Sequence, residues 1–198
     1  MDDTAVVKLR LPIALLLFVL GGAAGLIGDH SHVVTGTTEY LPRSQALPFI
    51  WSSPIYFPIL VGSATVFLAE LRLHLPSPRT RVTLRQGVAG VAAVLGSYVV
   101  TAMLHTAPIV PIMTLICAFA AITFCALGDR PAILCGTLIA LVGPAVEIGI
   151  AAAGQFRYAP GSDGLFGVAP WLVPLYFAFG VIAALFGEIA SAATDSRR

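Results

Sequence analysis

The stretch CALGDRPAILCG, residues 125–136, places one polar pair, Asp129 and Arg130, between two long apolar runs. Pro131 follows the pair, and proline suits the first turn of a helix because its missing N–H would have no partner there. The pattern predicts a tight polar turn between two antiparallel helices. The apolar runs on both sides are long enough for helices that cross a bilayer.

The composition agrees with this prediction. Hydrophobic residues make up 58% of the chain, charged residues make up 11%, and the mean hydropathy is +0.92. A soluble domain of 198 residues could not bury so much apolar surface. The net charge is +1, and the basic residues lie at segment ends without forming a stripe for nucleic acid. We therefore expect an integral membrane protein.

Six runs are long enough to span a hydrocarbon core of about 30 Å at roughly 1.5 Å per helical residue. None shows the period of two that is typical of a β-barrel strand. The sequence predicts an all-α membrane protein, a bundle of six transmembrane helices, with residues 1–198 as a single domain. The expected spans are about 11–28, 51–71, 87–104, 107–128, 131–153 and 169–187.

The basic residues also predict an orientation. If both termini are cytoplasmic, nine basic residues lie inside and two, Arg43 and Arg157, lie outside. Cytoplasmic loops of membrane proteins carry such an excess of lysine and arginine. The nine are Lys8, Arg10, Arg72, Arg79, Arg81, Arg85, Arg130, Arg197 and Arg198.

Prolines lie in the outer portions of four spans, and Pro144 lies well inside the fifth. Proline removes a backbone donor and kinks a helix, so we expect a bundle that is tight inside and spread outside, around an apolar cavity. Glu147 is the one carboxylate well inside a span; it either contacts the cavity mouth or reaches the outer interface. Tyr98 and Trp51 are further candidates for the mouth.

Other chemistry has weaker support. Asp29, His30 and His32 could ligate a metal, but a solvated polar loop explains them better, and we expect no metal or cofactor. No hydrolase, P-loop or dinucleotide motif is present. Ser63 and His105 could in principle meet as nucleophile and base, which would make an intramembrane hydrolase.

Three segments resemble the Insig (insulin-induced gene) family. They are FIWSSPIYFPILVGSATVFLAEL at 49–71, ALGDRP at 126–131, and GQFRYAPGSDGLFGVAPWLVPLYFAFGVIAALFGE at 154–188. The resemblance implies a membrane protein with cytosolic termini that binds oxysterols and holds partner proteins carrying a sterol-sensing domain. It also implies that Asp129 binds a protein partner, and that Leu95, Ile112 and Cys125 stand at lipid-pocket positions. The partner itself is not identified.

Ten arginines against one lysine, with abundant alanine, valine and glycine, suggest a GC-rich genome. We therefore expect a bacterial, actinobacterial homologue in the cytoplasmic membrane; a eukaryotic one would lie in the endoplasmic reticulum. The predicted function is non-enzymatic binding of a sterol-like or diacylglycerol-like lipid, as a sensor or regulator. The alternative is a small carrier or flippase. Gly21 and Gly25 at close-packing spacing favour a homo-oligomer, either trimer or dimer.

Overall fold

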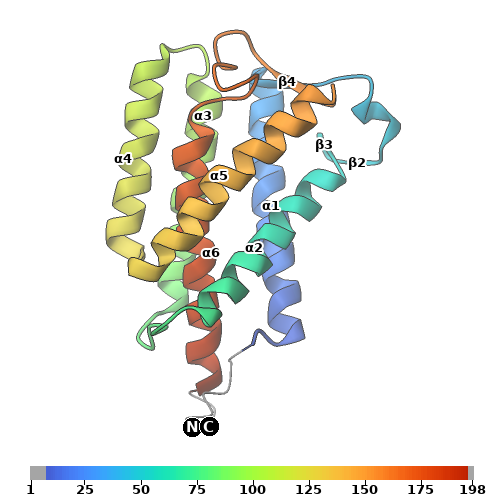
Figure 1. The fold of residues 1–198 in the computed structure, drawn as a ribbon. Coiled ribbons are helices and arrows are strands. Elements are labelled where there is room, and N and C mark those ends of the chain that lie inside the picture. The colour runs from blue at the N-terminus through green and yellow to red at the C-terminus, as the bar shows by residue number, and fades with distance from the viewer. Residues whose placement is uncertain (1–7, 196–198) are drawn as a thin grey trace.

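The computed structural model describes residues 8–195, and Figure 1 shows them as a bundle of helices with short strands at one end. The elements in chain order are α1 (Leu11–Thr35), β1 (Thr38–Tyr40), a 3₁₀ turn (Ser44–Ala46), β2 (Phe49–Ile50), β3 (Ser53–Pro54), α2 (Tyr56–His74), α3 (Leu84–Leu104), α4 (Ile109–Leu127), α5 (Arg130–Ala152), β4 (Phe156–Tyr158) and α6 (Leu172–Asp195).

Six helices in the described part of the chain are long and apolar enough to cross a membrane. The prediction of an all-α, six-helix membrane protein is confirmed. We call the end where α1 begins and α6 ends the inner end, and the end that carries the four strands the outer end (Figure 1).

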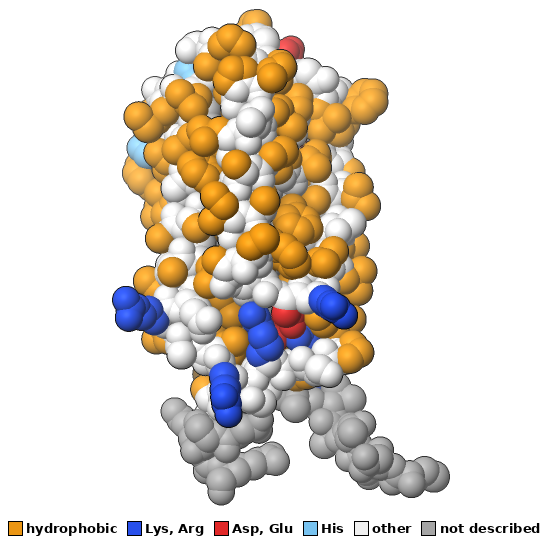
Figure 2. Space-filling view, turned by 90° about the vertical axis from the view of Figure 1, so that its left-hand side faces the viewer, with side chains coloured by type: hydrophobic (Ala, Val, Ile, Leu, Met, Phe, Trp, Pro, Cys, Tyr) orange, Lys and Arg blue, Asp and Glu red, His pale blue; other side chains and the backbone are white. Residues whose placement is uncertain are grey.

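Lysine and arginine side chains gather near the inner end in Figure 2, and hydrophobic side chains cover most of the visible face above them. The predicted orientation, with the inner end in the cytoplasm, rests on this clustering of basic residues at one end. The cytoplasmic placement of the termini stays a prediction, and Arg197 and Arg198 lie outside the described residues.

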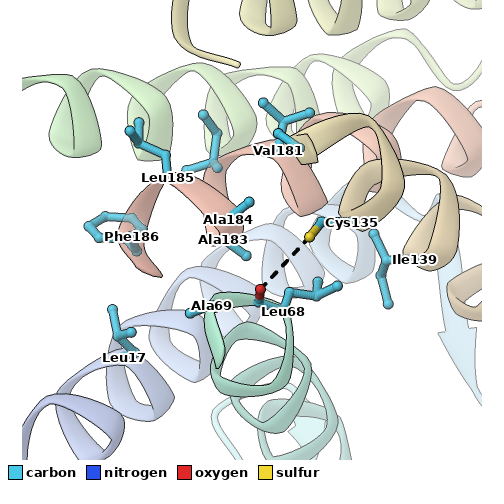
Figure 3. Packing of buried hydrophobic residues seen from close by; sticks show 12 residues of the cluster. Leu17, Leu68, Ala69, Cys135, Ile139, Val181, Ala183, Ala184, Leu185 and Phe186 are labelled. Atoms are coloured by element: carbon cyan, nitrogen blue, oxygen red, sulfur yellow. Dashed lines mark hydrogen bonds between the residues drawn. The ribbon is translucent and has the colours of Figure 1, made fainter. Parts of the chain in front are cut away.

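Helix α6 is the central helix of the bundle. It packs against α2, α3, α4 and α5, and residues 181–188 are all buried. Small residues allow this close packing: a Cβ on Gly187 would collide with the Ala69 carbonyl of α2, and one on Gly180 would meet the Cys135 carbonyl oxygen of α5 at 2.6 Å. Figure 3 shows Ala183 and Ala184 of α6 beside Leu68 and Ala69 of α2.

The strands join loops that are distant in the sequence. β1 pairs with β4 in antiparallel register, with Thr38 opposite Tyr158 and Tyr40 opposite Phe156, so the loop after α1 is tied to the loop after α5. β2 and β3 form a hairpin just before α2. These pairings lie at the outer end of the bundle (Figure 1).

Helix ends follow the local sequence. Asp129 Oδ1 accepts a hydrogen bond from the backbone N–H of Ala132 at 2.9 Å, so Asp129 is the N-cap of α5 and Arg130 is already its first residue. Thr83 and Gln86 form a capping box at the start of α3.

Two boundaries differ from the predicted spans for tertiary reasons. Helix α1 continues to Thr35 instead of ending near 28, because Asp29 and His32 find buried partners on other elements. Asp29, His30 and His32 therefore belong to a helix and not to a polar loop. Helix α2 begins at Tyr56 because residues 49–54 form the β2–β3 hairpin.

Candidate functional site

A cavity of about 490 Å³ lies between α2 and α5, from the middle of both helices to their outer ends. Most of its wall is aliphatic and aromatic, from residues such as Leu60, Phe67, Leu138 and Val142. Polar side chains line the cavity mainly near its outer end. They are Asp29, Thr38, Tyr40, Tyr56, Tyr98, Glu147, Tyr158 and Tyr176, with Ser63 on α2.

Glu147 lies on α5, one turn after Pro144, and is only 8% exposed. Tyr158 donates a hydrogen bond to its Oε2 at 2.9 Å, and Tyr176 donates one to its Oε1 at 2.5 Å. Each carboxylate oxygen therefore accepts one phenol hydroxyl. Two rigid rings from β4 and α6 hold the carboxylate in place at the cavity.

Asp29 is the second carboxylate at the cavity and is 5% exposed. Tyr40 donates to its Oδ2 at 2.9 Å, and Ser53 donates to the same oxygen at 2.5 Å. Among the residues that the structure describes, neither Asp29 nor Glu147 forms an ion pair with lysine, arginine or histidine. Hydrogen bonds from hydroxyl groups therefore stabilise both acids.

The phenols that bond these acids remain donors. Burial, with a smaller contribution from the nearby carboxylate, raises the pKa of Tyr40 and Tyr158 above the ordinary value for tyrosine. Both hydroxyls therefore keep their protons at neutral pH.

Two buried hydroxyls at the cavity have no hydrogen-bond partner among the described residues. They are the Thr38 Oγ1 and the Tyr56 hydroxyl, and both side chains line the cavity. A buried hydroxyl without a partner costs free energy, so a polar group inside the cavity would relieve that cost. The outer end of the cavity thus combines two hydrogen-bonded acids with two buried hydroxyls that have no partner among the described residues.

A second cavity, of about 90 Å³, lies between α1, α3 and α6. Its walls are almost entirely apolar. The side chains that separate the two cavities line both of them, and they are Phe57, Val61, Tyr98, Tyr176 and Phe179.

The structure brings together some of the predicted site residues. Tyr98 and Glu147 line the larger cavity, and Leu95 lines the smaller one. Ile112 is buried in the packing between α4 and the outer loops and borders neither cavity.

Two further predicted residues are exposed. Cys125 lies on the exposed face of α4, and Trp51, 62% exposed at the tip of the β2–β3 hairpin, stacks on His30 at 3.7 Å. Neither lines either of the two cavities. The β2–β3 hairpin separates Trp51 from α2, where the sequence suggested that a span begins.

Sequence reasoning missed Asp29, Thr38, Tyr56 and Tyr176 as cavity residues. The available signal for Asp29 was an acid directly after an apolar run, but placing the end of the first span near 28 assigned it to a solvated loop. Tyr40 and Tyr158 were not predicted as site residues either, because the strand pairing that places them at the cavity is not visible in the sequence.

The structure does not bring together the proposed nucleophile and base. Ser63 lines the larger cavity from α2, whereas His105 lies at the outer end of α3, where its Nδ1 is 2.8 Å from the Ala102 carbonyl oxygen. The described residues contain no group of three metal-ligating side chains. His30 contacts Ser52 and His32 contacts Thr101, so the two rings face different partners.

Asp129 belongs to a separate cluster of charges at the inner end. Arg72 donates to Asp129 at 2.5 Å and to Glu188 at 2.7 Å, and Arg79 donates to Glu188 at 2.7 Å. Arg79 also donates to the carbonyl oxygens of Leu127, the last residue of α4, and of Gly128. The cluster joins α2, the loop after it, the α4–α5 turn and α6.

Comparison with known proteins supplies relatives of high identity, although no family model matches the sequence. The INSIG protein homolog of Mycolicibacterium vanbaalenii is 63% identical over 185 residues, which are 93% of this chain and 90% of that protein. The crystal structure of a mycobacterial Insig homolog from Mycobacterium vanbaalenii has a TM-score of 0.92 and 63% identity, and the match covers 94% of this chain and 97% of that one.

A second crystal structure contains a cross-linked trimer of that homolog in which a cysteine replaces one arginine. It matches with a TM-score of 0.92 and 61% identity over the same shares of the two chains. These matches confirm the resemblance that the three sequence segments indicated. With this identity over nearly its whole length, the chain belongs to the Insig family.

Proposed function

We propose that this membrane protein binds a sterol-like or diacylglycerol-like lipid in the larger cavity and acts as a lipid sensor or regulator. The observation that carries the proposal is an apolar cavity of about 490 Å³ with polar groups near one end. Small-molecule sites are typically about 300–1,000 Å³ with apolar walls and a few polar groups that orient the ligand. An amphipathic lipid has an apolar body and one polar head, which match the apolar wall and the polar end of the cavity.

The lipid would reach the cavity from the side. Leu60, Phe67, Val142 and Val146 line the cavity and are also exposed on the outside of the bundle. These residues stand on α2 and α5, so the opening between the two helices faces the acyl chains of the bilayer. A ligand could enter there without crossing water.

The smaller cavity helps to distinguish the two candidate classes of lipid. A sterol has one rigid body and needs only the larger cavity. A diacylglycerol has two chains, and the second could enter the smaller cavity after movement of shared residues such as Phe57 and Phe179. Crowding each cavity separately therefore distinguishes the two ligands.

The test is mass spectrometry of lipids that remain bound after gentle purification in detergent. Ala64→Trp fills the larger cavity, and we expect it to lose a neutral lipid that the wild type retains. Ala121→Trp puts the same side chain on the exposed face of α4 and should retain the lipid. Leu95→Trp crowds the smaller cavity and should reduce retention of a two-chain lipid but not of a sterol.

Circular dichroism and thermal melting of each variant confirm that it is folded. Retention of bulk phospholipid alone by the wild type, or equal retention by Ala64→Trp and Ala121→Trp, would contradict the proposal. A reconstituted transport assay in liposomes would then test the carrier or flippase alternative.

Three further parts of the proposal concern the assembly, the location and Asp129. The cross-linked trimer of the mycobacterial homolog supports a homotrimer for this chain. The bacterial source of the relatives supports the cytoplasmic membrane as its location. The basic residues at the inner end support cytoplasmic termini, and the mutual packing of the six helices supports residues 1–198 as one domain. Asp129 pairs with Arg72 and caps α5. We propose that it contributes to the binding of a protein partner indirectly, by fixing the conformation of the inner surface.

A further inference from the structure

The turn of the β2–β3 hairpin displays an aromatic side chain in a conformation that aromatic residues rarely adopt. Ile50 pairs with Ser53, so Trp51 and Ser52 form a two-residue turn, and Trp51 has a φ of 59°. Asparagine, aspartate and glycine are the usual residues of such a turn, because a bulky side chain is strained at positive φ. Trp51 stacks on His30 but remains 62% exposed. Contacts within the protein therefore explain its presence only in part.

The surface around Trp51 is apolar and uncharged. No charged residue lies between Arg43 and Glu70 in the sequence. The exposed side chains in and beside the hairpin are Leu47, Phe49, Ile50, Trp51 and Ile55. Ile55 precedes α2 directly, and Ile59 and Leu60 continue the exposed apolar surface along that helix. Because α2 is apolar and long enough to cross a membrane, the hairpin extends the surface that α2 presents to lipid.

The hairpin lies beside α1 and not above it. Ser52 Oγ is 2.8 Å from His30 Nδ1, and Ser53 donates a hydrogen bond to Asp29. Helix α1 continues beyond His30 for more than one turn, to Thr35. Figure 1 accordingly shows the hairpin at the side of the bundle, next to the start of α2. The tip of the hairpin is therefore nearer to the middle of the bilayer than the outer end of α1.

The backbone of the hairpin sets a limit to its depth. Each of its strands has two residues and pairs only with the other, so each has an outer edge of backbone groups. Exposed strand edges do not occur in the hydrocarbon core, because nothing there can bond to their polar groups. Water and lipid head groups can supply such bonds. Tryptophan also prefers this level, where its ring meets the upper acyl chains and its N–H can donate to lipid oxygens.

We propose that the β2–β3 hairpin is an interfacial anchor, which inserts Trp51, Phe49 and Ile50 among the lipid head groups and upper acyl chains of the leaflet at the outer end. Its partner is the lipid surface itself. Helix α2 begins directly after the hairpin, and its residues Tyr56 and Phe57 line the larger cavity. The anchor thus fixes the outer end of this cavity wall relative to the leaflet. The inference goes beyond the proposed function and requires no ligand in the cavity.

Tryptophan fluorescence of the reconstituted full-length protein tests the anchor. The chain has two tryptophans, and the second, Trp171, is fully buried. Trp51→Phe leaves Trp171 alone, so its signal is subtracted from that of the wild type to isolate Trp51. The quenchers are phosphatidylcholines with a nitroxide on the head group, near the top of an acyl chain or near its end, and acrylamide on both sides of the membrane. We expect the first two lipids to quench Trp51 most strongly and acrylamide to quench it weakly.

A matched control places the same indole at the outer end but in water. The double variant Trp51→Phe/Glu39→Trp moves it to β1, where the side chain of Glu39 is 61% exposed and pairs with Arg157. A charged pair is costly inside a membrane and marks a position in contact with water. We expect acrylamide to quench this indole several-fold more strongly than Trp51, and the nitroxide lipids to quench it more weakly. Circular dichroism confirms that each variant is folded.

Three results would overturn the anchor. Quenching of Trp51 by acrylamide as strong as that of the control indole, with little quenching by the lipids, would place the hairpin in water. Strongest quenching by the nitroxide near the chain end would place it in the hydrocarbon core. Protection from every quencher would show that another protein surface covers it. None of these results depends on lipid retained in the cavity, so the anchor and the proposed function fail separately.

Discussion

Arg72 carries a full positive charge with a completely buried side chain, and Glu188 is almost as deeply buried. Such a charge is tolerated only when it is paired and hydrogen-bonded, and Arg72 bonds to Asp129, to Glu188 and to two carbonyl groups of the following loop. Removing one member of a buried pair leaves the other without compensation. The cluster therefore stabilises the inner end only while it is complete.

We expect Glu188→Gln to lower the free energy of unfolding by about 3–5 kcal/mol, because Arg72 and Arg79 both lose an ionic partner. Glu39→Gln breaks a pair in which both side chains are more than half exposed, and it should cost at most about 1 kcal/mol. Thermal melting of both variants in the same detergent measures the difference. Equal effects would show that the buried cluster adds no more stability than a surface ion pair.

At the scale of the elements, close contact between helices sets the shape of the cavities. Gly28 of α1 faces the ring of Tyr98 on α3, and a Cβ at Gly28 would overlap that ring. Tyr98 lines both cavities, so the separation of α1 and α3 positions part of their common wall. This contact is an example of packing that acts directly on the candidate site.

Gly28→Ala should destabilise the protein by about 1–3 kcal/mol, because overpacking forces Tyr98 or α1 to move. It should also reduce the retention of bound lipid. Gly96→Ala is the control on α3, where an added Cβ meets nothing within 4 Å, and both stability and retention should stay close to wild type. If Gly28→Ala behaves like Gly96→Ala, the wall at Tyr98 is more adaptable than the packing indicates.

At the scale of the whole molecule, charge and shape divide the two ends. The buried ion cluster and most of the described basic residues lie at the inner end, while the strands and the polar part of the larger cavity lie at the outer end. This asymmetry predicts one orientation in the membrane. It would place the lipid head group near the outer leaflet.

Cysteine labelling tests this orientation. Arg81→Cys places a thiol in the loop between α2 and α3, and Gln45→Cys places one in the loop between β1 and β2; both positions are exposed. In spheroplasts of a bacterial host, a membrane-impermeant maleimide should label Gln45→Cys and reach Arg81→Cys only after lysis. The native cysteines lie within α4 and α5, and the wild type provides their background. The reverse pattern would contradict the predicted topology.

The sequence by itself determined the class of protein, the number of helices and the family. The bilayer acts as a uniform apolar solvent, so each crossing has to be a continuous apolar helix of about 20 residues, and that requirement is readable along the chain. The turn at Asp129 and Arg130 was predicted from the polar pair and Pro131 between two apolar runs. It depends on local contacts, since Asp129 caps α5 through Ala132, three residues away.

The tertiary structure alone decided which side chains meet. Arg72 and Glu188 are 116 residues apart in the sequence, and Asp29 and Glu147 come to one cavity from helices α1 and α5. Helices that are apolar on every face do not show which face turns inward, so hydropathy cannot predict their rotation or their neighbours. The separation of Trp51 from the cavity, and the arrival of Tyr40 and Tyr158 at its acids, follow from helix packing and strand pairing over long sequence distances.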